Sequence, residues 1–167
     1  MGAMHRFGPS YLPSAGGQEP GAIFDPTAGG WAARPAFESG AGGLVSTLDD
    51  YLAFAQALLH GGGAILSRSS VAAMTTDQLY AVDGSLQVGP DATGAVGWGF
   101  GVGVVRRKTH IAESPGTYAW TGGLGTSWAN DPVEGLVGIL LTNQLFSGPS
   151  LPPIHQDFWT SIYTALT

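Results

Sequence analysis

Residues 116–144 read GTYAWTGGLGTSWANDPVEGLVGILLTNQ and contain three short apolar runs separated by turn-forming residues. The runs cover residues 117–120, 126–129 and 136–142. Gly122-Gly123 interrupts the chain after the first run, and Asn130-Asp131-Pro132 with Gly135 interrupts it after the second. Proline fixes φ and aspartate caps its own turn, so the second interruption predicts a hairpin connection. The whole pattern predicts an antiparallel meander of strands.

The last apolar run differs from the other two because residues 136–141, LVGILL, carry no charge and show no alternation. Such a run is typical of a strand that is buried on both faces. We therefore expect this strand to be central in its sheet.

The same stretch carries a motif in Trp120-Thr121-Gly122-Gly123. A Gly-Thr strand, an Asp-Pro turn and an apolar strand that ends in Thr142-Asn143-Gln144 follow it. This order resembles the third motif region of the serine β-lactamase-like hydrolases, a family of class C β-lactamases, penicillin-binding proteins and related esterases. Their motif is Lys-Thr-Gly or His-x-Gly, and in some esterases Trp-x-Gly.

A second match lies upstream, where residues 39–47 read SGAGGLVST and are followed by Asp50-Tyr51 and Phe54. This segment resembles the one that leads into the family's helical domain. Together the matches reach from about Arg6 to the C-terminus and correspond to roughly the C-terminal half of a family member. The resemblance implies an α+β class: a partial β-lactamase/transpeptidase-like fold with an antiparallel sheet and the C-terminal helix packed on it.

The chain divides into an extended Gly/Pro-rich arm at 1–43, a helical-domain fragment at 44–96, and the sheet with its C-terminal helix at 97–167. We expect the arm to lie over a surface and to be held there by its aromatic residues, Phe7, Tyr11, Phe24, Trp31 and Phe37.

Helical spacing and capping residues predict one helix after Thr47 and a shorter one after Ser67, which fades near Thr76. Residues 97–104 alternate glycine with apolar side chains, which predicts one strand with a bare face. That face could receive either a closely packed helix or a ligand. Pro152-Pro153 opens the last helix. Its sheet-facing side is predicted to hold the residues that recur at every fourth position, Ile154, Phe158, Ile162 and Leu166.

The composition excludes several functions. A net charge of −6 with only six basic residues cannot supply a phosphate-binding stripe, so we expect no nucleic-acid partner. No apolar run reaches the ~18 residues that a membrane span needs, and residues 1–4 lack the apolar core of a signal peptide. The absence of cysteine excludes disulfides and thiolate chemistry. The sequence determines no compartment.

The family reaction, as the resemblance implies it, is acyl transfer through a Ser-x-x-Lys nucleophile assisted by Tyr-x-Asn or Ser-x-Asn. This sequence contains neither motif. Its only lysine, Lys108, follows Val105 by three places, and its two asparagines, Asn130 and Asn143, follow Trp128 and Leu141 by two places. We therefore expect the chain alone to be inactive.

The resemblance implies a catalytic role for Gly123, because the family places one of two oxyanion-hole N–H donors directly after the third motif. Such a donor contributes ~3–4 kcal/mol to lowering the barrier. The motif residues Trp120, Thr121 and Gly122 are the expected substrate-binding residues. Trp120 stands where the family carries a cation that attracts a β-lactam carboxylate, which favours an ester-like or neutral acyl substrate. The alternative is that Trp120 is a core aromatic residue and that the glycines only form a tight turn.

Other chemistries find less support. The four histidines, His5, His60, His110 and His155, are expected at capping or surface positions. No Gly-x-Ser-x-Gly elbow is present, and no His-Glu-x-x-His spacing predicts a metal site. We expect no metal and no cofactor.

The sequence therefore predicts the C-terminal portion of a serine hydrolase that acts on an ester, amide or lactam through an acyl-enzyme. The alternative is a non-catalytic binding module on the same fold. The expected partners are a small-molecule or peptide-like acyl substrate, and either the N-terminal half of the same protein or a second copy of the chain. The second copy follows from the family resemblance: family members pair strands of their N-terminal half alongside the strand at residues 136–142, so without that half we expect this strand to have an unprotected edge.

Overall fold

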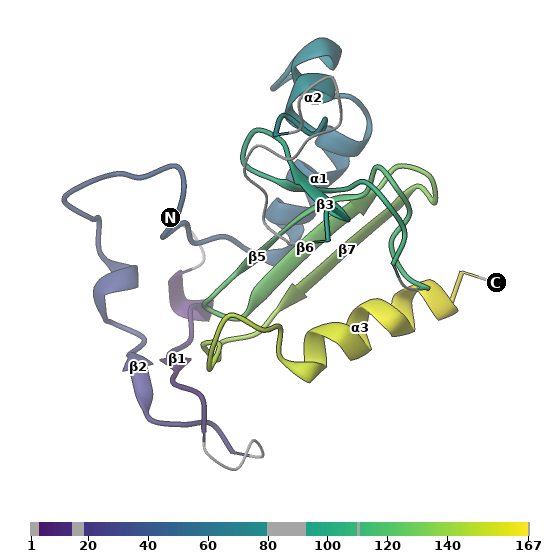
Figure 1. Cartoon of the computed structure of the whole chain (residues 1–167). Helices are drawn as coiled ribbons and strands as arrows, with labels where there is room; N and C mark the ends of the chain where they lie inside the picture. Colours follow the sequence, from purple (N-terminus) through teal and green to yellow (C-terminus); the bar gives the residue numbers. More distant parts are fainter. Residues whose placement is uncertain (1–3, 15–18, 80–92, 110, 167) are drawn as a thin grey trace.

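The computed structural model describes residues 4–14, 19–79, 93–109 and 111–166 (Figure 1). The sheet strands, in chain order, are β3 (Val96–Trp98), β4 (Gly103–Val105), β5 (Tyr118–Gly122), β6 (Thr126–Asp131) and β7 (Leu136–Leu141). The helices are α1 (Leu48–Leu59), α2 (Arg68–Met74) and α3 (Pro153–Thr164). Short elements of the arm are η1 (Met4–Arg6), β1 (Ser10–Tyr11), β2 (Ile23–Asp25) and η2 (Gly30–Ala32).

The five sheet strands pair antiparallel in the order β3-β4-β5-β6-β7, so the predicted meander and the α+β class are confirmed. The expectation of a central last strand is wrong for the described part of the chain, since β7 lies at the edge of the sheet. A run of apolar residues reports that both faces are covered, and here helices cover them, although Gly138 is the one buried residue of β7. It does not report how many strands lie beside the run.

The two faces of the sheet are covered by different helices. On one face the side-chain amide of Asn130 donates to the carbonyl oxygen of Ala55 in α1, over 2.7 Å. On the other face α3 lies so close to β7 that a Cβ at Gly138 would stand 2.3 Å from the ring of Trp159. Figure 1 shows α3 running along one side of the sheet and α1 on the opposite side.

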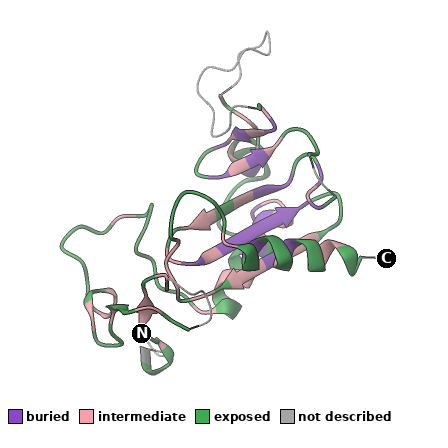
Figure 2. Ribbon diagram, turned by 60° about the horizontal axis from the view of Figure 1, so that its bottom comes forward, coloured by how far each residue is buried: buried purple, intermediate pink, exposed green. Residues whose placement is uncertain are grey.

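The core lies between the sheet and α1, and Trp128 of β6 is at its centre. The Trp128 ring makes edge contacts with Tyr51 at 5.7 Å and with Tyr118 at 5.9 Å between ring centroids. The buried cluster consists of Ala55, Leu58, Val71, Val102, Val104, Tyr118 and Trp128. Figure 2 shows the buried residues concentrated on the sheet strands and the arm largely exposed.

Both predicted helices of the middle segment are present, and each begins at its predicted cap. Thr47 accepts a hydrogen bond from the backbone N–H of Asp50 at 3.2 Å, and Ser67 accepts one from Ser70 at 3.1 Å. Side-chain oxygens at these positions satisfy N–H groups that have no partner inside the helix. Local sequence therefore determined where these helices start.

The prediction of one strand over residues 97–104 is wrong, because this segment folds back on itself as the β3–β4 hairpin. Gly101 provides the positive φ, +85°, that the connection requires. The bare face receives packed protein: a Cβ at Gly97 would stand 2.2 Å from the Asp77 carboxyl carbon, and one at Gly99 would stand 1.9 Å from the Met74 carbonyl oxygen. Of the two occupants weighed from the sequence, close packing is the observed one.

The sheet-facing side of α3 also differs from the prediction. His155 and Trp159 are its buried residues, whereas Ile154 and Leu166 are 54% and 45% exposed. At these two turns of the helix, residues one position later than expected face the sheet. The prediction is confirmed for Ile162, because a Cβ at Gly138 would stand 3.2 Å from its Cδ1. Gly138 of β7 explains the choice, because its missing side chain leaves room for the Trp159 ring.

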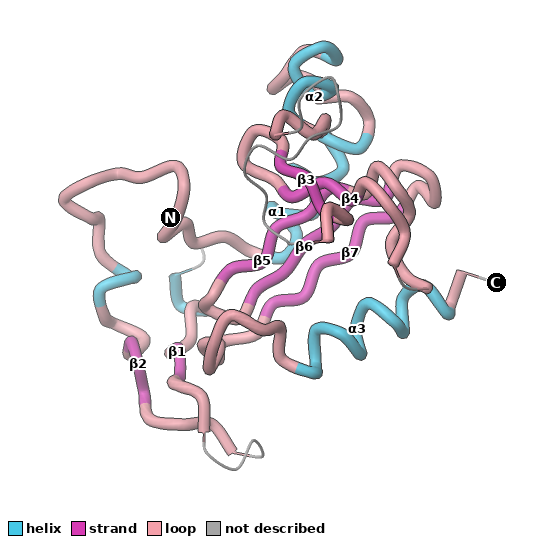
Figure 3. Tube along the Cα trace, viewed as in Figure 1, coloured by secondary structure: helices cyan, strands magenta, loops and turns pink. Residues whose placement is uncertain are grey.

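The arm extends from the body of the molecule and is attached near β1 (Figure 3). The Tyr11 N–H donates to the Asn143 carbonyl at 2.8 Å, and the Leu145 N–H donates to the Tyr11 carbonyl at 2.8 Å. Tyr11 thus holds the arm through its backbone. Phe37 is 80% exposed, so its expected role in holding the arm is wrong. Among the described residues, no helix combines the length and apolar character that crossing a membrane requires.

Candidate functional site

The predicted site residues lie at the connection between β5 and β6. Gly122 pairs with Thr126, which leaves a loop of residues 123–125. The Gly125 N–H donates to the Gly122 carbonyl at 3.0 Å, and Gly125 has a φ of +97°. A three-residue hairpin loop commonly closes with a residue of positive φ at its last position. That residue is Gly125. The turn therefore requires a glycine at position 125, and not at position 122 or 123.

The turn sets the direction of the Gly123 N–H. In a trans peptide the C=O and N–H groups point in opposite directions. The Gly122 carbonyl points into the turn towards Gly125, and the Gly123 N–H of the same peptide must therefore point out of it. Among the described residues this N–H makes no hydrogen bond, and a Cβ at Gly123 would meet nothing within 4 Å. An outward-pointing donor with open space beside it is available to a ligand.

The neighbouring edge of β5 is open. Strand β4 pairs with β5 only at Gly103↔Ala119 and Val104↔Tyr118, so the segment from Trp120 to Gly122 runs on past the end of β4. Only β6 flanks this segment among the described strands. The structure thus brings the predicted residues Trp120, Thr121, Gly122 and Gly123 together beside an unpaired strand edge.

Trp120 is not a core residue. It is 51% exposed, and its ring meets that of Trp98 edge to face, with centroids 4.9 Å apart and an interplanar angle of 90°. The pair forms an apolar wall next to the open edge. Sequence reasoning placed Trp98 on a single long strand and missed this contact. The β3–β4 hairpin brings Trp98 close to Trp120, because Trp98 pairs with Gly103 and Gly103 pairs with Ala119.

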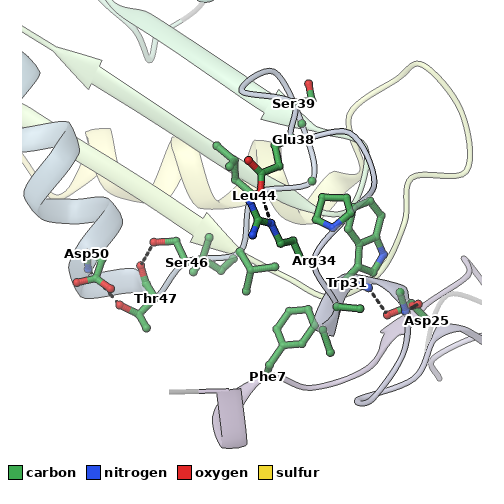
Figure 4. A pocket seen from close by; sticks show the side chains of 18 of the residues that line it. Phe7, Asp25, Trp31, Arg34, Glu38, Ser39, Leu44, Ser46, Thr47 and Asp50 are labelled. Carbon is green, nitrogen blue, oxygen red and sulfur yellow. Dashed lines mark hydrogen bonds and ion pairs between the residues drawn. The ribbon is translucent and has the colours of Figure 1, made fainter. Parts of the chain in front are cut away.

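A large hollow lies elsewhere, between the arm and the start of α1 (Figure 4). It has a volume of about 1400 Å³, and the residues that line it include Phe7, Trp31, Leu44, Thr47 and Leu141. None of the predicted site residues lines it. Its size therefore says nothing about the chemistry expected at Gly123.

The described histidines divide into exposed and buried ones. His60 is exposed and its ring contacts the Gln56 carbonyl at 2.7 Å, which agrees with the predicted capping role. His155 contradicts its predicted capping or surface position, because it is 1% exposed and its Nδ1 lies 3.0 Å from the Ser127 hydroxyl. Burial lowers the pKa of His155 and keeps the ring neutral. His110 lies outside the described residues.

This Ser127–His155 pair is the nearest approach to a nucleophile and base in the described structure. Both residues are buried, Ser127 being 3% exposed, and the Phe146 ring lies 5.0 Å from the His155 ring. A substrate carbonyl could not reach the hydroxyl without opening the sheet from α3. We therefore assign the pair a structural role in the contact between α3 and the sheet. Among the described residues, no group of three or more His, Cys, Asp or Glu side chains could hold a metal ion.

Three comparisons with known proteins bear on the identity of the chain. Esterase EstB of Burkholderia gladioli is 32% identical over 137 residues, which cover 80% of this chain and 31% of EstB. The LovD6 mutant of simvastatin synthase from Aspergillus terreus superposes with a TM-score of 0.75 at 16% identity, covering 98% of this chain and 43% of that chain. EstCE1, a hydrolase with promiscuous acyltransferase activity, gives a TM-score of 0.63 at 25% identity, covering 85% of this chain and 40% of that chain.

These similarities have different reach. At 16% identity, the likeness to simvastatin synthase establishes the fold alone, which is the β-lactamase/transpeptidase fold. The chain spans about 30% of the length of the curated relatives that it matches. Residues 6–155 match the family model described as Beta-lactamase, and the chain therefore belongs to the β-lactamase-like family of serine hydrolases.

Proposed function

We propose that this chain carries the carbonyl-binding strand of a serine hydrolase of the β-lactamase-like family. In this proposal the Gly123 N–H is one donor of the oxyanion hole, and β5 receives the acyl group along its open edge. The nucleophile and its lysine partner come from outside this sequence, which contains no Ser-x-x-Lys. The reaction is hydrolysis through an acyl-enzyme.

One observation carries the proposal: the Gly123 N–H points out of the turn, next to the part of β5 that β4 does not pair with, and a Cβ at Gly123 would meet no atom within 4 Å. An oxyanion hole needs donors that are already oriented and are not used by the protein itself. The neighbouring strand edge offers backbone groups that would align an acyl chain.

The substrate we infer is an ester-like or neutral acyl compound. Trp120 occupies the first position of the third motif and presents a half-exposed aromatic ring supported by Trp98. Such a wall favours apolar groups and offers no cation to a carboxylate. The relative EstB is an esterase and EstCE1 a hydrolase with promiscuous acyltransferase activity, which agrees with this inference.

The test is a chimera in which the part of this chain that aligns with EstB replaces the matching segment of EstB, assayed with p-nitrophenyl esters. We expect turnover, and we expect Gly123→Pro to lower kcat by about 10²–10³-fold because it removes one oxyanion donor. Gly123→Ala is the matched control. It keeps the N–H, and its methyl group meets no atom within 4 Å of the protein, so most of kcat should remain.

The chain alone provides the second arm of this test. It should hydrolyse neither nitrocefin nor p-nitrophenyl esters, and fluorophosphonate should label no serine. Stoichiometric labelling would contradict the proposal, since it would reveal a nucleophile in this sequence. A folded chimera whose kcat is unchanged by Gly123→Pro would refute the oxyanion role of Gly123, and a folded chimera without turnover would favour the other candidate, a binding module without chemistry.

We also propose that the outer edge of β7 pairs with a further strand, from the remaining part of such a hydrolase or from a second copy. The edge carries no Lys, Pro or charge. The arm does not cover it, because the described backbone contacts of Tyr11 reach residues 143–145, beyond the end of β7. Sedimentation of the chain at micromolar concentration tests this: we expect association, and a stable monomer near 17 kDa would refute it.

A further inference from the structure

The segment that follows β7 holds the site turn from behind. The Thr142 hydroxyl donates to the Gly125 carbonyl oxygen at 2.5 Å, and the Thr142 N–H donates to the same oxygen at 3.0 Å. The Phe146 N–H donates to the Gly123 carbonyl at 2.9 Å. Residues 123 and 125 are thus both bound to one segment that is distant in sequence.

We propose that Thr142 is a positioning residue that fixes the direction of the Gly123 N–H. The connection has two steps: Thr142 holds the carbonyl of Gly125, and the Gly125 N–H holds the carbonyl of Gly122. The peptide that ends in this Gly122 carbonyl is the one that carries the Gly123 N–H. Rotation of that peptide requires the Gly125–Gly122 hydrogen bond to break.

Packing supports the same connection. A Cβ at Gly125 would stand 2.2 Å from the Thr142 hydroxyl oxygen and 2.4 Å from the Gln144 carbonyl oxygen. Gly125 is buried, and Thr142 is partly buried, so water has limited access to replace the hydroxyl. A carbonyl that accepts two donors loses one of them when the hydroxyl is removed, while the backbone bond from Thr142 remains.

The segment itself is anchored in turn by the arm. The Tyr11 backbone makes hydrogen bonds to Asn143 and Leu145, and the Asn143 side-chain amide donates to the Pro9 carbonyl at 3.1 Å. We call the two hydrogen bonds from Thr142 to the Gly125 carbonyl the clamp. The segment that carries the clamp is held on both sides, by β7 before it and by the arm after it.

The first measurement needs no activity and uses the full chain. We expect Thr142→Val to shift the amide resonances of Gly123 and Gly125 and to speed hydrogen exchange at the Gly125 amide about tenfold. The amide of Ala129, in the middle of β6, should be unaffected. Thr142→Ser should restore the wild-type values, because it keeps the hydroxyl. Thr126→Val is the matched control, because it makes the same chemical change one residue after Gly125. Unchanged hydrogen exchange at the Gly125 amide in Thr142→Val would overturn the proposal.

The second measurement connects the clamp to chemistry and rests on the proposed function of Gly123. In the EstB chimera, Thr142→Val should lower kcat about tenfold with KM within twofold, and Thr142→Ser should recover it. If Gly123→Pro abolishes turnover while Thr142→Val leaves kcat intact, the positioning role is refuted and the proposed function stands. If Gly123→Pro leaves kcat intact, the proposed function fails, and the exchange result still decides whether the clamp exists.

Discussion

Strand β6 lies between two turns that are built in opposite ways. At the turn before it, the loop of residues 123–125 is made of glycines around Leu124, and one N–H points outward with no partner among the described residues. At the turn after it, Asp131 is 1% exposed and its carboxylate accepts four hydrogen bonds. The first turn leaves the Gly123 N–H available, whereas the second directs the N–H groups of Val133 and Glu134 onto a buried carboxylate.

The carboxylate of Asp131 connects three parts of the chain. It accepts the N–H groups of Val133 and Glu134 in its own turn, at 2.9 and 3.2 Å. It also accepts the Ser114 N–H at 3.1 Å and the Tyr163 hydroxyl of α3 at 2.8 Å. The second turn thus ties three segments of the chain together, whereas the first turn has the role of a ligand site only in our proposal.

The largest expected effect is on the Asp131 turn. Asp131→Ala leaves four donors without their acceptor, so we expect the free energy of unfolding to fall by about 3–4 kcal/mol. Urea denaturation measures it. The control is Glu134→Ala, at an exposed position of the same turn, where the change should stay within about 0.5 kcal/mol. Equal effects of the two substitutions would show that the turn, and not the carboxylate, carries the stability.

The pH dependence of that stability has a definite sign. Burial opposes ionisation of Asp131, but the hydrogen bonds from Tyr163, Ser114 and Glu134 outweigh it and lower the pKa of this carboxyl. A lowered pKa in the folded state means that the contribution is present above pH ~4 and is lost as the pH falls below it. In Asp131→Ala this acid-sensitive component should be missing.

The next effect compares the positive-φ glycines of these two turns, Gly125 and Gly135. Gly125→Ala meets the Thr142 hydroxyl and the Gln144 carbonyl at a φ of +97°, whereas Gly135→Ala meets no atom within 4 Å at a φ of +63°. We expect losses of about 3 kcal/mol at Gly125, where clash adds to strain, and about 1 kcal/mol at Gly135, where strain acts alone. Thermal denaturation of both variants decides it. Similar losses would mean that the segment after β7 yields easily, and the clamp would then be weak.

A smaller effect concerns Tyr163, whose substitution by Phe removes one of the four donors to Asp131. The expected loss is about 1.5 kcal/mol at neutral pH, since the acceptor is charged. Burial raises the pKa of the Tyr163 phenol above its ordinary value. The hydrogen bond to Asp131 and the negative charge of Asp131 raise this pKa further. Its contribution is therefore complete below pH ~10 and is lost as the pH rises further. The stability gap between wild type and Tyr163→Phe should narrow above pH 10, and a constant gap would contradict this.

The smallest effect sharpens the contrast at the open turn. Gly123→Ala adds a methyl group in open space at a residue without positive φ. Its free energy of unfolding should change by no more than about 0.5 kcal/mol. A large loss would show that Gly123 is constrained by the fold itself, as Gly125 is. The argument for a donor kept available to a ligand would then lose its support.

Local sequence was sufficient for features whose cause is local. The starts of α1 and α2 follow from Thr47 and Ser67, because a helix cap is a contact over three residues. The hairpin after β6 follows from Asp131 and Pro132 for the same reason, although Asn130 and Asp131 are themselves the last residues of the strand. The family motif at Trp120–Gly123 and the absence of Ser-x-x-Lys could be read directly from the order of residues.

Tertiary structure decided features that depend on what packs against a residue. Alternation over residues 97–104 is equally compatible with a strand and a hairpin, and the segment from Met74 to Asp77 selected the hairpin by filling its bare face. Gly138 leaves room for the Trp159 ring against the sheet. His155 lies one turn earlier on the same face of α3, so it is buried as well. The direction of the Gly123 N–H depends on Thr142, which lies 19 positions away in sequence. A one-dimensional pattern records which residues are apolar or flexible, whereas hydrogen bonds between distant segments depend on how those segments meet in space.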